Sequence, residues 1–284
     1  MKYLITGRNG QLAAAFVRRF ELRSTAFCAP DETLLDITDV KKTEACVAAE
    51  KPDVILNCAA YNLVDKAEQE PDRTMLVNHL GPRNLADAAR KHGAVLVHYS
   101  SDYVFDGRKE TALYSESDAP NPLNQYGRSK LAGEEAVREV LRDRSLVFRM
   151  SWVFGEGRQN FIVKLLEWSA VQPYLRIACD EFSVPTWTET AVDVTLRALE
   201  QGVSGLYHLT NSGCCSRYEW AKSVLKKKRI DKFIRPVPMD SFELPAKRPK
   251  FSAMSNRTIT DKLNFPIPAW EEAVDRFLGQ EVRS

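Results

Sequence analysis

A tyrosine and a lysine four residues apart, Tyr126 and Lys130, stand in the segment Asn-Gln-Tyr-Gly-Arg-Ser-Lys. Residues at this spacing share one face of a helix. A phenol has a pKa of about 10, and a neighbouring ammonium stabilises the phenolate, which brings the phenol proton within reach of an oxyanion. A hydroxyl at Ser101 could bond to the same oxygen. The three side chains predict a proton donor, the cation that tunes it and an orienting hydrogen-bond donor.

The elements that must position these groups are a strand and a helix. Residues 95–99 form a β-branched and aromatic run that predicts a buried strand. This strand would bring Ser101 and Asp102 to its carboxyl end, where open α/β sheets carry their sites. A helix should follow Pro122, capped by residues 124–125. Tyr-x-x-x-Lys also occurs by chance on many helices, with the lysine stem lying along the surface, so the rest of the chain decides.

The start of the chain favours a nucleotide-binding turn. Residues 2–6 predict a strand, and Gly7 and Gly10 open a helix that runs through Phe20. Glycines at these places permit positive φ and let backbone N–H groups approach a pyrophosphate at the helix N-terminus. This is a Rossmann-type fingerprint of the G-x-x-G form, with Ala13 where a third glycine often stands. A glycine pair after a strand also marks ordinary tight turns.

The first half of the chain alternates between strand and helix patterns. We expect further strands at 24–28, 52–57 and 145–149, the last as a sixth strand, with helices at 39–49 and 71–91. Alternation of this kind predicts an α/β fold, a Rossmann-type doubly wound parallel sheet with helices on both faces. We expect residues 1–151 to form the dinucleotide-binding domain, with 189–209 rejoining it. A smaller C-terminal substrate-binding lobe, rich in proline connections, would comprise 152–188 and 210–284.

Composition limits the partners. The chain has 284 residues, of which 44% are hydrophobic and 27% charged, and its net charge of +2 offers no basic field for nucleic acid or a membrane surface. The first residues contain too short an apolar run for a signal peptide, and no apolar stretch reaches membrane-spanning length, which predicts a cytoplasmic protein. The six cysteines lack C-x-x-C pairs and the four histidines lack ligand spacing, so reduced thiols and no metal site are expected.

Taken together, the ordered motifs resemble the extended short-chain dehydrogenase/reductases and, within them, the dTDP-4-dehydrorhamnose reductase family. The resemblance covers nearly the whole chain. It rests on the segments 6–12 (TGRNGQL), 35–39 (LDITD), 52–57 (PDVILN), 64–68 (VDKAE), 100–107 (SSDYVFDG), 126–130 (YGRSK), 149–155 (RMSWVFG) and 248–249 (RP).

The resemblance implies a role for each matched position. Ser101, Tyr126 and Lys130 would be the catalytic trio, with Tyr126 and Lys130 also contacting the cofactor. The other residues expected at the cofactor are Gly7, Gly10, Gln11, Leu12, Asp36, Ile37, Ala59, Ala60, Tyr61 and Tyr99. The residues expected at the sugar nucleotide are Ser101, Asp102, Trp152 and Arg248. For Trp152 core packing is the alternative, and for Arg248 a surface ion pair.

The chain departs from the family pattern at three places. Ser101 replaces the usual threonine, which keeps the hydroxyl and loses the methyl group that restricts its rotamers. Ala13 replaces a glycine. Some members use acidic residues for a magnesium-mediated dimer contact, and here Ala15 occupies one of those positions although Glu189 is retained. The resemblance therefore leaves a homodimer possible and argues against the metal.

The expected activity is an NADPH- or NADH-dependent reduction of the C4 ketone of a nucleotide-linked 6-deoxy-4-ketohexose, with dTDP-4-dehydro-L-rhamnose giving dTDP-L-rhamnose. The residues after 24–28 do not distinguish NADPH from NADH. A related ketoreductase acting on another sugar is the nearest alternative. A non-catalytic regulatory subunit resembling that of methionine adenosyltransferase is a second alternative, and an epimerase or dehydratase of the same superfamily is a third.

Overall fold

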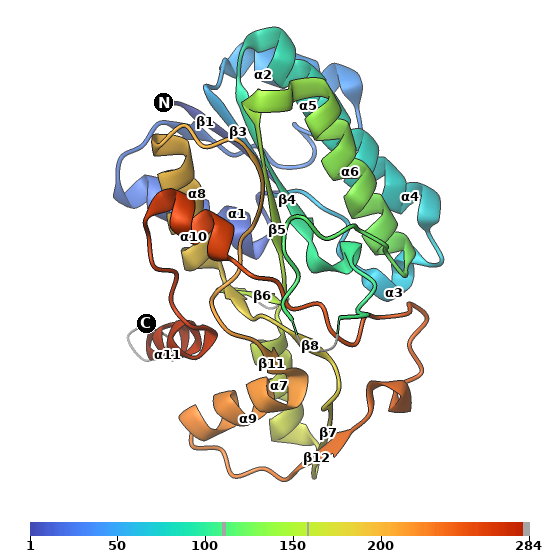
Figure 1. Ribbon diagram of the computed structural model, residues 1–284. Coiled ribbons are helices and arrows are strands. Elements are labelled where there is room, and N and C mark those ends of the chain that lie inside the picture. Colours follow the sequence, from blue (N-terminus) through green and yellow to red (C-terminus); the bar gives the residue numbers. More distant parts are fainter. Residues whose placement is uncertain (110–111, 158, 281–284) are drawn as a thin grey trace.

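The protein is built on a six-stranded parallel sheet, shown in the computed structural model of Figure 1, which describes residues 1–109, 112–157 and 159–280. The strands lie in the order β10 (Gly205–His208), β5 (Ser145–Met150), β4 (Val95–Ser101), β3 (Val54–Asn57), β1 (Tyr3–Thr6) and β2 (Phe27–Cys28). Every neighbouring pair is parallel. The expected fold class is confirmed. The strand at 145–149 is the fifth of this sheet, and the sixth is β10.

Helices cover both faces of the sheet (Figure 1). One face carries α1 (Gln11–Leu22), α8 (Thr188–Glu200) and α10 (Arg257–Leu263), and the other carries α2 (Val40–Glu50), α5 (Gly81–His92) and α6 (Gln125–Leu141). Phe16 and Phe20 of α1 are fully buried in the first core, and Leu85 of α5 in the second. The strands are apolar on both sides because both sides are covered, which is why they read as continuous apolar runs.

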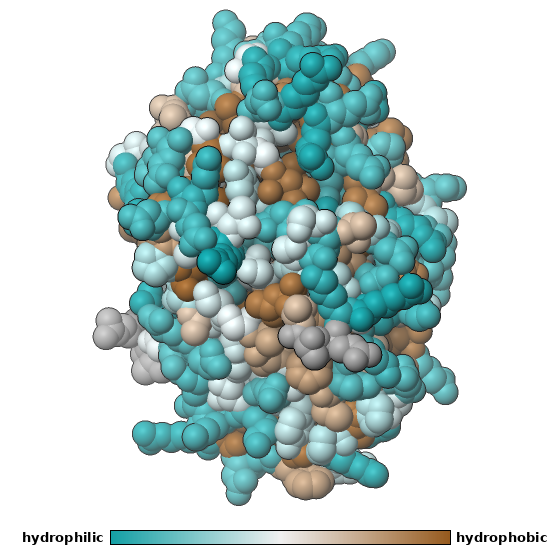
Figure 2. All heavy atoms as spheres, viewed as in Figure 1, coloured by the Kyte–Doolittle hydropathy of each residue, from teal (hydrophilic) through white to brown (hydrophobic). Residues whose placement is uncertain are grey.

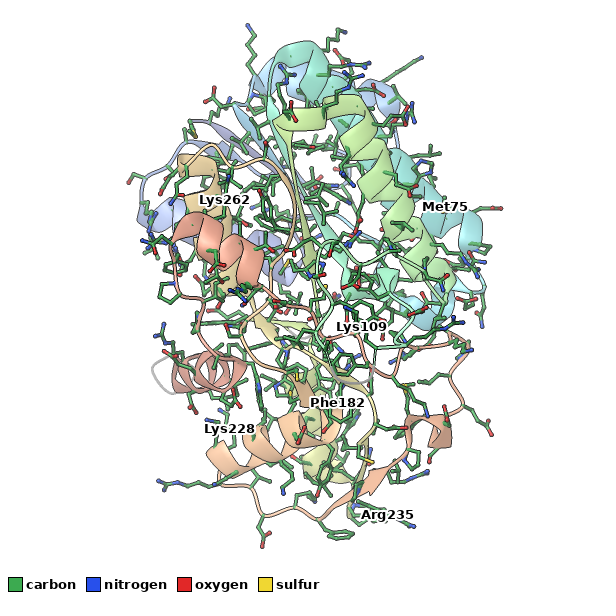
Figure 3. The ribbon with its side chains drawn as sticks, in the orientation of Figure 1. Met75, Lys109, Phe182, Lys228, Arg235 and Lys262 are labelled. Atoms are coloured by element: carbon green, nitrogen blue, oxygen red, sulfur yellow. The ribbon has the colours of Figure 1, made fainter. Side chains whose placement is uncertain are left out.

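The lobe lies below the carboxyl ends of the strands in Figure 1. It has its own aromatic core around Trp220. Its helices are α7 (Phe161–Val171), α9 (Arg217–Lys227) and α11 (Trp270–Gln280), and its short strand pairs are β6 (Val153–Phe154) with β9 (Thr186–Trp187), β7 (Leu175–Ala178) with β12 (Ile234–Val237), and β8 (Phe182–Ser183) with β11 (Cys215–Ser216). Figure 3 places Phe182 in the part of the lobe nearest the sheet and Arg235 at the far end of the lobe.

The second strand is shorter than expected. Only Phe27–Cys28 pairs with β1, whereas we expected a strand from Ser24. The preceding helix continues to Leu22, and Ser24 adopts a φ of +50° while its N–H donates to Glu21. Residues that close a helix in this way cannot also extend a strand.

The helix expected at 71–91 contains a π-helical turn. It consists of α4 (Pro71–Met75), the π turn Leu76–Leu80 and α5, in which Pro82 is the second residue. Proline has no N–H to donate to the preceding turn, which favours this wider geometry. The turn directs the buried Asn78 at the backbone of Tyr61 and the hydroxyl of Ser129. It thereby ties the loop after β3 to α6.

The two parts of the chain interlock. We propose that residues 1–151 and 189–209 form the sheet unit, because α8 packs on α1 and β10 pairs with β5. Part of the segment assigned to the lobe packs on the sheet as well, since Ile259, Leu263 and Ile267 belong to the core beneath α1 and α8. The short helix α3 (Val64–Ala67) lies near the other edge of the crevice between the two parts.

The surface in Figure 2 is hydrophilic over most of the visible face, with apolar side chains in small patches. Among the described residues, no helix combines the length and apolar character needed to cross a membrane. No group of three histidine, cysteine, aspartate or glutamate side chains in the described segments is arranged to hold a metal ion.

Candidate active site

A crevice of about 390 Å³ lies where the carboxyl ends of the strands face the lobe. Its sheet side is formed by the turn before α1, the ends of β3 and β4, and the first turns of α6. Its lobe side is formed by the chain after β5 and by the start of α9. The residues expected to act on ligands that line it are Gly10, Gln11, Leu12, Ala59, Ala60, Tyr99, Ser101, Asp102, Tyr126, Lys130 and Trp152.

The expected catalytic trio converges on this crevice. Ser101 ends β4, and Tyr126 and Lys130 lie on the first turns of α6. The helix begins there because Asn124 caps it, accepting the N–H of Gly127 at 2.7 Å. All three side chains are at least nine-tenths buried. The structure therefore brings together a hydroxyl, a phenol and an ammonium that the sequence places 25 residues or more apart between strand and helix.

Burial dominates the chemistry of Tyr126. It raises the pKa of the phenol to about 12, and a hydrogen bond with the Ser101 hydroxyl acts in the opposite direction. We expected Lys130 to lower this pKa, and in the structure the lowering comes from Ser101 instead. A phenol with this pKa stays protonated at neutral pH, so Tyr126 is held as a proton donor. Its Oη also lies 3.5 Å from Asn62 Oδ1.

A hydrogen bond to the central sheet fixes the position of Lys130. Its Nζ donates to the carbonyl oxygen of Tyr99 at 2.6 Å. Burial lowers the pKa of the ammonium to about 8, although the carboxylate of Glu134 acts in the opposite direction. Glu134 is one helical turn further along α6 and forms a buried ion pair with Arg149 at 2.7 Å. A buried ion pair therefore lies one helical turn beyond Lys130 on α6.

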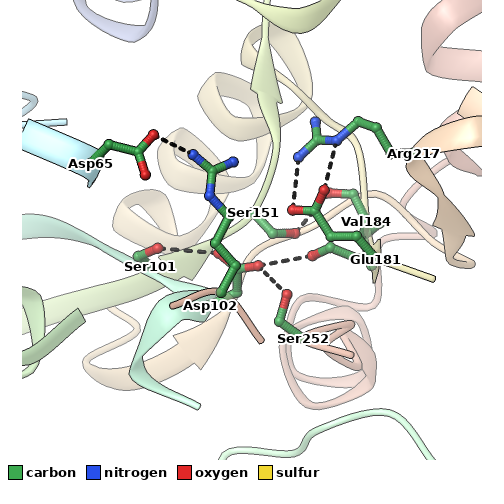
Figure 4. Close-up of polar contacts among 10 residues, drawn as sticks. Asp65, Ser101, Asp102, Ser151, Glu181, Val184, Arg217 and Ser252 are labelled. Carbon is green, nitrogen blue, oxygen red and sulfur yellow. Dashed lines mark hydrogen bonds and ion pairs between the residues drawn. The ribbon is translucent and has the colours of Figure 1, made fainter. Parts of the chain in front are cut away.

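Asp102 lines the crevice, and its expected contact with the substrate stays a prediction. Its carboxylate is buried and accepts three serine hydroxyls: Ser101 at Oδ1 (3.1 Å), and Ser183 (2.9 Å) and Ser252 (2.5 Å) at Oδ2. Figure 4 shows Asp102 between Ser101 and Ser252. Burial raises the pKa of Asp102 to about 6 against the effect of the three serine bonds. The residue joins the end of β4 to two segments of the lobe.

The turn before α1 fits a dinucleotide. Gly7 has a φ of +66°, and a Cβ there would lie 2.7 Å from the backbone of Ala59, so only glycine lets the two segments meet. The helix starts at Gly10, and within the described chain no side chain caps its first N–H groups. Free N–H groups at a helix N-terminus bind phosphate. The Oε1 atom of Gln11 is also buried with no partner among the described residues, while its Nε2 donates to Val153 at 3.1 Å.

Four residues expected at the cofactor are engaged elsewhere. The carboxylate of Asp36 accepts the N–H and hydroxyl of Thr38, and the side chain of Ile37 is buried in the core against Gly81. Tyr61 donates to Glu70 at 2.9 Å and packs beside Tyr126.

The fourth, Tyr99, bonds Thr195 at 2.9 Å through its hydroxyl in the core beneath α8. Its contribution to the crevice is the backbone oxygen that holds Lys130. Of the four residues only Tyr99 lines the crevice, and contact of the four with the cofactor stays a prediction.

A second cavity of about 710 Å³ opens into the lobe. It shares Gln159 and Arg217 with the crevice, so the two volumes meet at these residues. The guanidinium of Arg217 lies 3.6 Å from the ring of Trp152 and pairs with Glu181 through two hydrogen bonds of 3.3 Å. A ligand that spans both cavities would pass this cation.

Trp152 stands at the junction of the cavities in a strained conformation. Its φ is +40°, which is unfavourable for a side chain of this size, and such outliers cluster at functional sites. The indole stacks on Trp220 with ring centres 5.6 Å apart. Trp152 therefore lines the crevice and also packs in the lobe core, and its contact with the sugar nucleotide stays a prediction.

Arg248 also lines the lobe cavity. Its Nη2 donates to Asp65 at 2.8 Å, which links the lobe to α3. Among the described residues its Nε has no partner although it is buried. The ion pair that the sequence offered as an alternative is present, and the same guanidinium retains a donor at the cavity wall.

Comparisons with known proteins show the family of the chain. A family model described as the RmlD substrate binding domain matches residues 1–283. The chain is 33% identical over 301 residues to a dTDP-4-dehydrorhamnose reductase of Escherichia coli K12, covering 99% of this chain and 98% of that protein. The chain belongs to the dTDP-4-dehydrorhamnose reductase (RmlD) family. This confirms the resemblance inferred from the motifs.

Solved structures of RmlD-family proteins have the same architecture. A dTDP-4-dehydrorhamnose reductase of Clostridium acetobutylicum superposes with a TM-score of 0.95 at 32% identity, covering 99% of this chain and all of that chain. A Bacillus anthracis reductase solved in complex with NADP superposes with a TM-score of 0.94 at 32% identity, covering 98% of this chain and 99% of that chain.

A further sequence relative is a spore coat polysaccharide biosynthesis protein of Bacillus subtilis. It is 32% identical over 279 residues, covering 98% of this chain and 97% of that protein.

Sequence reasoning missed several residues of this RmlD-family site. Arg217 is the most prominent of them, and the sequence did carry a signal for it. A cation at the first position of a helix opposes the helix dipole, so another interaction must hold it there. Glu181 and the ring of Trp152 supply that interaction. Gln159 and Asn62 had no comparable signal.

Proposed function

We propose that the protein is an NAD(P)H-dependent reductase of the C4 ketone of a dTDP-linked 6-deoxy-4-ketohexose, with dTDP-4-dehydro-L-rhamnose as substrate and dTDP-L-rhamnose as product. The observation that carries this proposal is the meeting of Ser101, Tyr126 and Lys130 in a crevice that opens into the lobe cavity at Arg217. Relatives that carry the reductase name match the chain over almost its whole length.

The residues present fit a dinucleotide. The Gly7 turn and the uncapped N-terminus of α1 would hold its pyrophosphate, with Ala59 and Ala60 beside it. Lys130 would face its nicotinamide ribose. When bound, the reduced cofactor supplies the hydride that adds to the ketone carbon. Support for the phosphorylated form comes from the bacillary relative solved with NADP.

The chain's own residues would handle the proton. Tyr126, held protonated by burial, would donate to the oxyanion that develops at C4. The hydroxyl of Ser101 would orient the same oxygen before transfer. Lys130, fixed by Tyr99, would place a positive charge beside the phenolate that remains.

The lobe cavity suits the nucleotide. Arg217 and Arg248 present guanidinium groups at its wall, and guanidinium pairs with phosphate in a two-pronged geometry. The aromatic side chains Phe161, Trp168 and Tyr174 line the rest and could stack on a base. With the diphosphate at the arginines, the sugar would lie toward Trp152 and the trio.

A Tyr126→Phe variant tests the proposal. We expect kcat to fall about 100- to 10,000-fold because the proton donor is lost, while the Kd for NADPH stays within about twofold. Tyr103→Phe is the matched control, since Tyr103 is buried in the same wall with its ring centre 5.8 Å from that of Tyr126. That variant should retain most of its turnover. Equal turnover of Tyr126→Phe and wild type would remove the phenol from the reaction.

A second candidate sugar has specific support. A dTDP-4-keto-6-deoxy-D-glucose reductase of Streptomyces niveus is 32% identical over 274 residues, covering 96% of this chain and 95% of that protein. Both substrates present a C4 ketone on a dTDP-linked sugar. Oxidation of NADPH measured with each purified ketosugar separates the two, and consumption of one NADPH per sugar excludes an epimerase or dehydratase. No oxidation with either would favour the regulatory-subunit alternative.

A homodimer, if formed, should not use a metal at Glu189. Ala15 is fully buried, and the carboxylate of Glu189 pairs with Arg18 at 3.0 Å and Arg19 at 2.8 Å. A carboxylate occupied by two guanidinium groups is a poor magnesium ligand. Sedimentation with and without a chelator should therefore give the same mass.

We infer a cytoplasmic location from the proposed cofactor, NAD(P)H, and the proposed dTDP-linked sugar substrate.

A further inference from the structure

The single hydrogen of the Ser101 hydroxyl has three competing acceptors: the carboxylate of Asp102, the phenol oxygen of Tyr126 and the ketone oxygen of a bound substrate. Ionised Asp102 can only accept, and its Oδ1 lies 3.1 Å from Ser101 Oγ, so the hydrogen points at the carboxylate. A charge-assisted bond of this kind is stronger than a bond to a neutral ketone oxygen. Ser101 Oγ also accepts the N–H of Tyr103 at 3.2 Å. In this state Ser101 has no hydrogen to offer the crevice.

The other carboxylate oxygen decides where a proton would go. Oδ2 of Asp102 already accepts the hydroxyls of Ser183 and Ser252 at 2.9 and 2.5 Å. A proton added to Asp102 is therefore placed on Oδ1, where it faces Ser101. The neutral carboxyl group would then donate to Ser101 Oγ, and the serine hydrogen would be free to turn toward the crevice.

We propose that Asp102 is a proton-switched positioning residue, which in its neutral form turns the Ser101 hydroxyl toward the reacting ketone oxygen and in its ionised form withholds it. The inference rests on the role of Ser101 in the proposed function. The proton moves only between Asp102 and solvent, and the hydrogen that orients the ketone stays on Ser101 throughout.

The surroundings of Asp102 favour the neutral form. The carboxyl group is 3% exposed, and the carboxylate of Glu181 faces it from the segment before β8, while Arg217 pairs with that carboxylate from α9. The phenols of Tyr103 and Tyr126 face it from the other side. Burial is the largest cause that raises the pKa of Asp102, to about 6, and Glu181 adds to it. A ligand that closes the crevice would exclude more water and favour the neutral form further.

An asparagine at this position should reproduce the neutral form. Its Oδ1 can accept both lobe serines, Ser183 and Ser252, while its Nδ2 donates to Ser101 Oγ. The contacts with Ser101, Ser183 and Ser252 are then kept at every pH. Asp102→Asn should therefore be an active enzyme, whereas a carboxylate needed for substrate contact or catalysis would make the same variant inactive.

The test is the pH profile of kcat/KM with NADPH and dTDP-4-dehydro-L-rhamnose between about pH 5 and 9, which reports groups of the free enzyme. For wild type we expect a decline of up to tenfold per pH unit above the pKa of Asp102. Asp102→Asn should lack that decline and exceed wild type at about pH 8. A separate decline near the pKa of Lys130, about 8, should remain in both.

A serine variant gives an independent readout. Ser252→Ala removes one donor from the carboxylate, which raises the pKa of Asp102 and should move the decline to higher pH. Ser151→Ala is the matched control, because Ser151 is as deeply buried beside the cluster and donates to Val184 instead (Figure 4). Its profile should coincide with that of wild type. A merely structural role of the cluster would lower thermal stability and leave the position of the decline unchanged.

The outcomes separate this inference from the proposed function. An inactive, folded Asp102→Asn, or a decline that Ser252→Ala leaves in place, would overturn the switch. If Asp102→Asn does not fold, the shift in Ser252→Ala alone decides. Ser101→Ala with full activity would instead refute the proposed role of Ser101, and the switch with it.

Discussion

The Nζ atom of Lys130 donates to the backbone carbonyl oxygen of Tyr99 across 2.6 Å, so the ammonium of α6 is anchored to the central strand β4. Both groups are buried, and the pKa of Lys130 falls to about 8 because burial disfavours its charge. The charge therefore destabilises the folded protein at neutral pH. The positive charge of Lys130 thus lowers the stability of the fold, whereas the proposed reaction uses that charge.

We predict that this opposition is visible in the pH dependence of stability. The folded pKa lies below the unfolded value of 10.5, so the unfolded chain binds more protons between about pH 8 and 10.5, and the free energy of unfolding should rise with pH there. The full difference between the folded and unfolded pKa values corresponds to on the order of 3 kcal/mol in the free energy of unfolding. Lys130→Met should lack this rise. Urea unfolding of both proteins at pH 8 and 10 measures it, and parallel changes in both would contradict the assignment.

The turn before α1 offers a second test. Gly7→Ala combines a positive φ with a Cβ placed 2.7 Å from the backbone of Ala59. Gly93→Ala is the matched control, because Gly93 has a φ of +79° and open space around its Cβ position. The free energy of unfolding of the control should fall by about 1 to 2 kcal/mol because of the positive φ alone. Gly7→Ala should lower the free energy of unfolding by roughly 1 to 3 kcal/mol more than the control does, because of overpacking. It should also lose NADPH binding. Equal losses in urea unfolding would show that the close approach to Ala59 is unimportant.

The parts of the site that the sequence predicts are those governed by local rules. Tyr126 and Lys130 share a helical face because they are four residues apart, and Asn124 caps their helix through a bond to a residue three positions later. Gly7 is required by a turn that directly follows a strand. Each of these relations is contained in a short window, so the pattern of residue types is enough to find it.

The parts that the sequence could not predict depend on distant segments. Asp102 meets Ser183 and Ser252, which are 81 and 150 residues further along the chain. A short-range pattern says nothing of such contacts, and an aspartate at a strand end reads equally as a ligand-binding residue. The carboxylate of Asp36 closes a local turn onto Thr38, and its place beside the cofactor stays a prediction.

The ion pair beneath Lys130 provides a stability prediction. Glu134 and the side chain of Arg149 are 1% and 4% exposed, and they share three hydrogen bonds of 2.7 to 3.2 Å. Glu134→Gln would leave the guanidinium buried without a counter-charge, which should destabilise the protein by about 3 to 5 kcal/mol. Glu135→Gln, at the next and exposed position of α6, should change stability by less than about 0.5 kcal/mol. Replacing both Glu134 and Arg149 by methionine should recover much of the loss, and a double-mutant cycle measures the coupling.

The junction of the two cavities provides the prediction that separates sugar-nucleotide binding from cofactor binding. Arg217 lies 3.6 Å from the ring of Trp152 and holds Glu181 through two hydrogen bonds. Lysine at this position keeps the charge but loses the planar fork and the stacking, which is worth about 1 to 2 kcal/mol when desolvated. Arg217→Lys should therefore raise the KM for dTDP-4-dehydro-L-rhamnose roughly five- to thirty-fold while the Kd for NADPH is unchanged.

The control for Arg217→Lys is Lys222→Ala, an exposed cation on the same helix that lies over Tyr218 and outside both cavities. Its KM should match that of wild type, because a general loss of positive charge on α9 does not reach the ligand. If the two variants change KM equally, the effect is not specific to the guanidinium of Arg217, and Arg217 is not a contact. If Arg217→Lys weakens NADPH instead, the guanidinium belongs to the cofactor side of the junction, and the order of ligands along the crevice must be reversed.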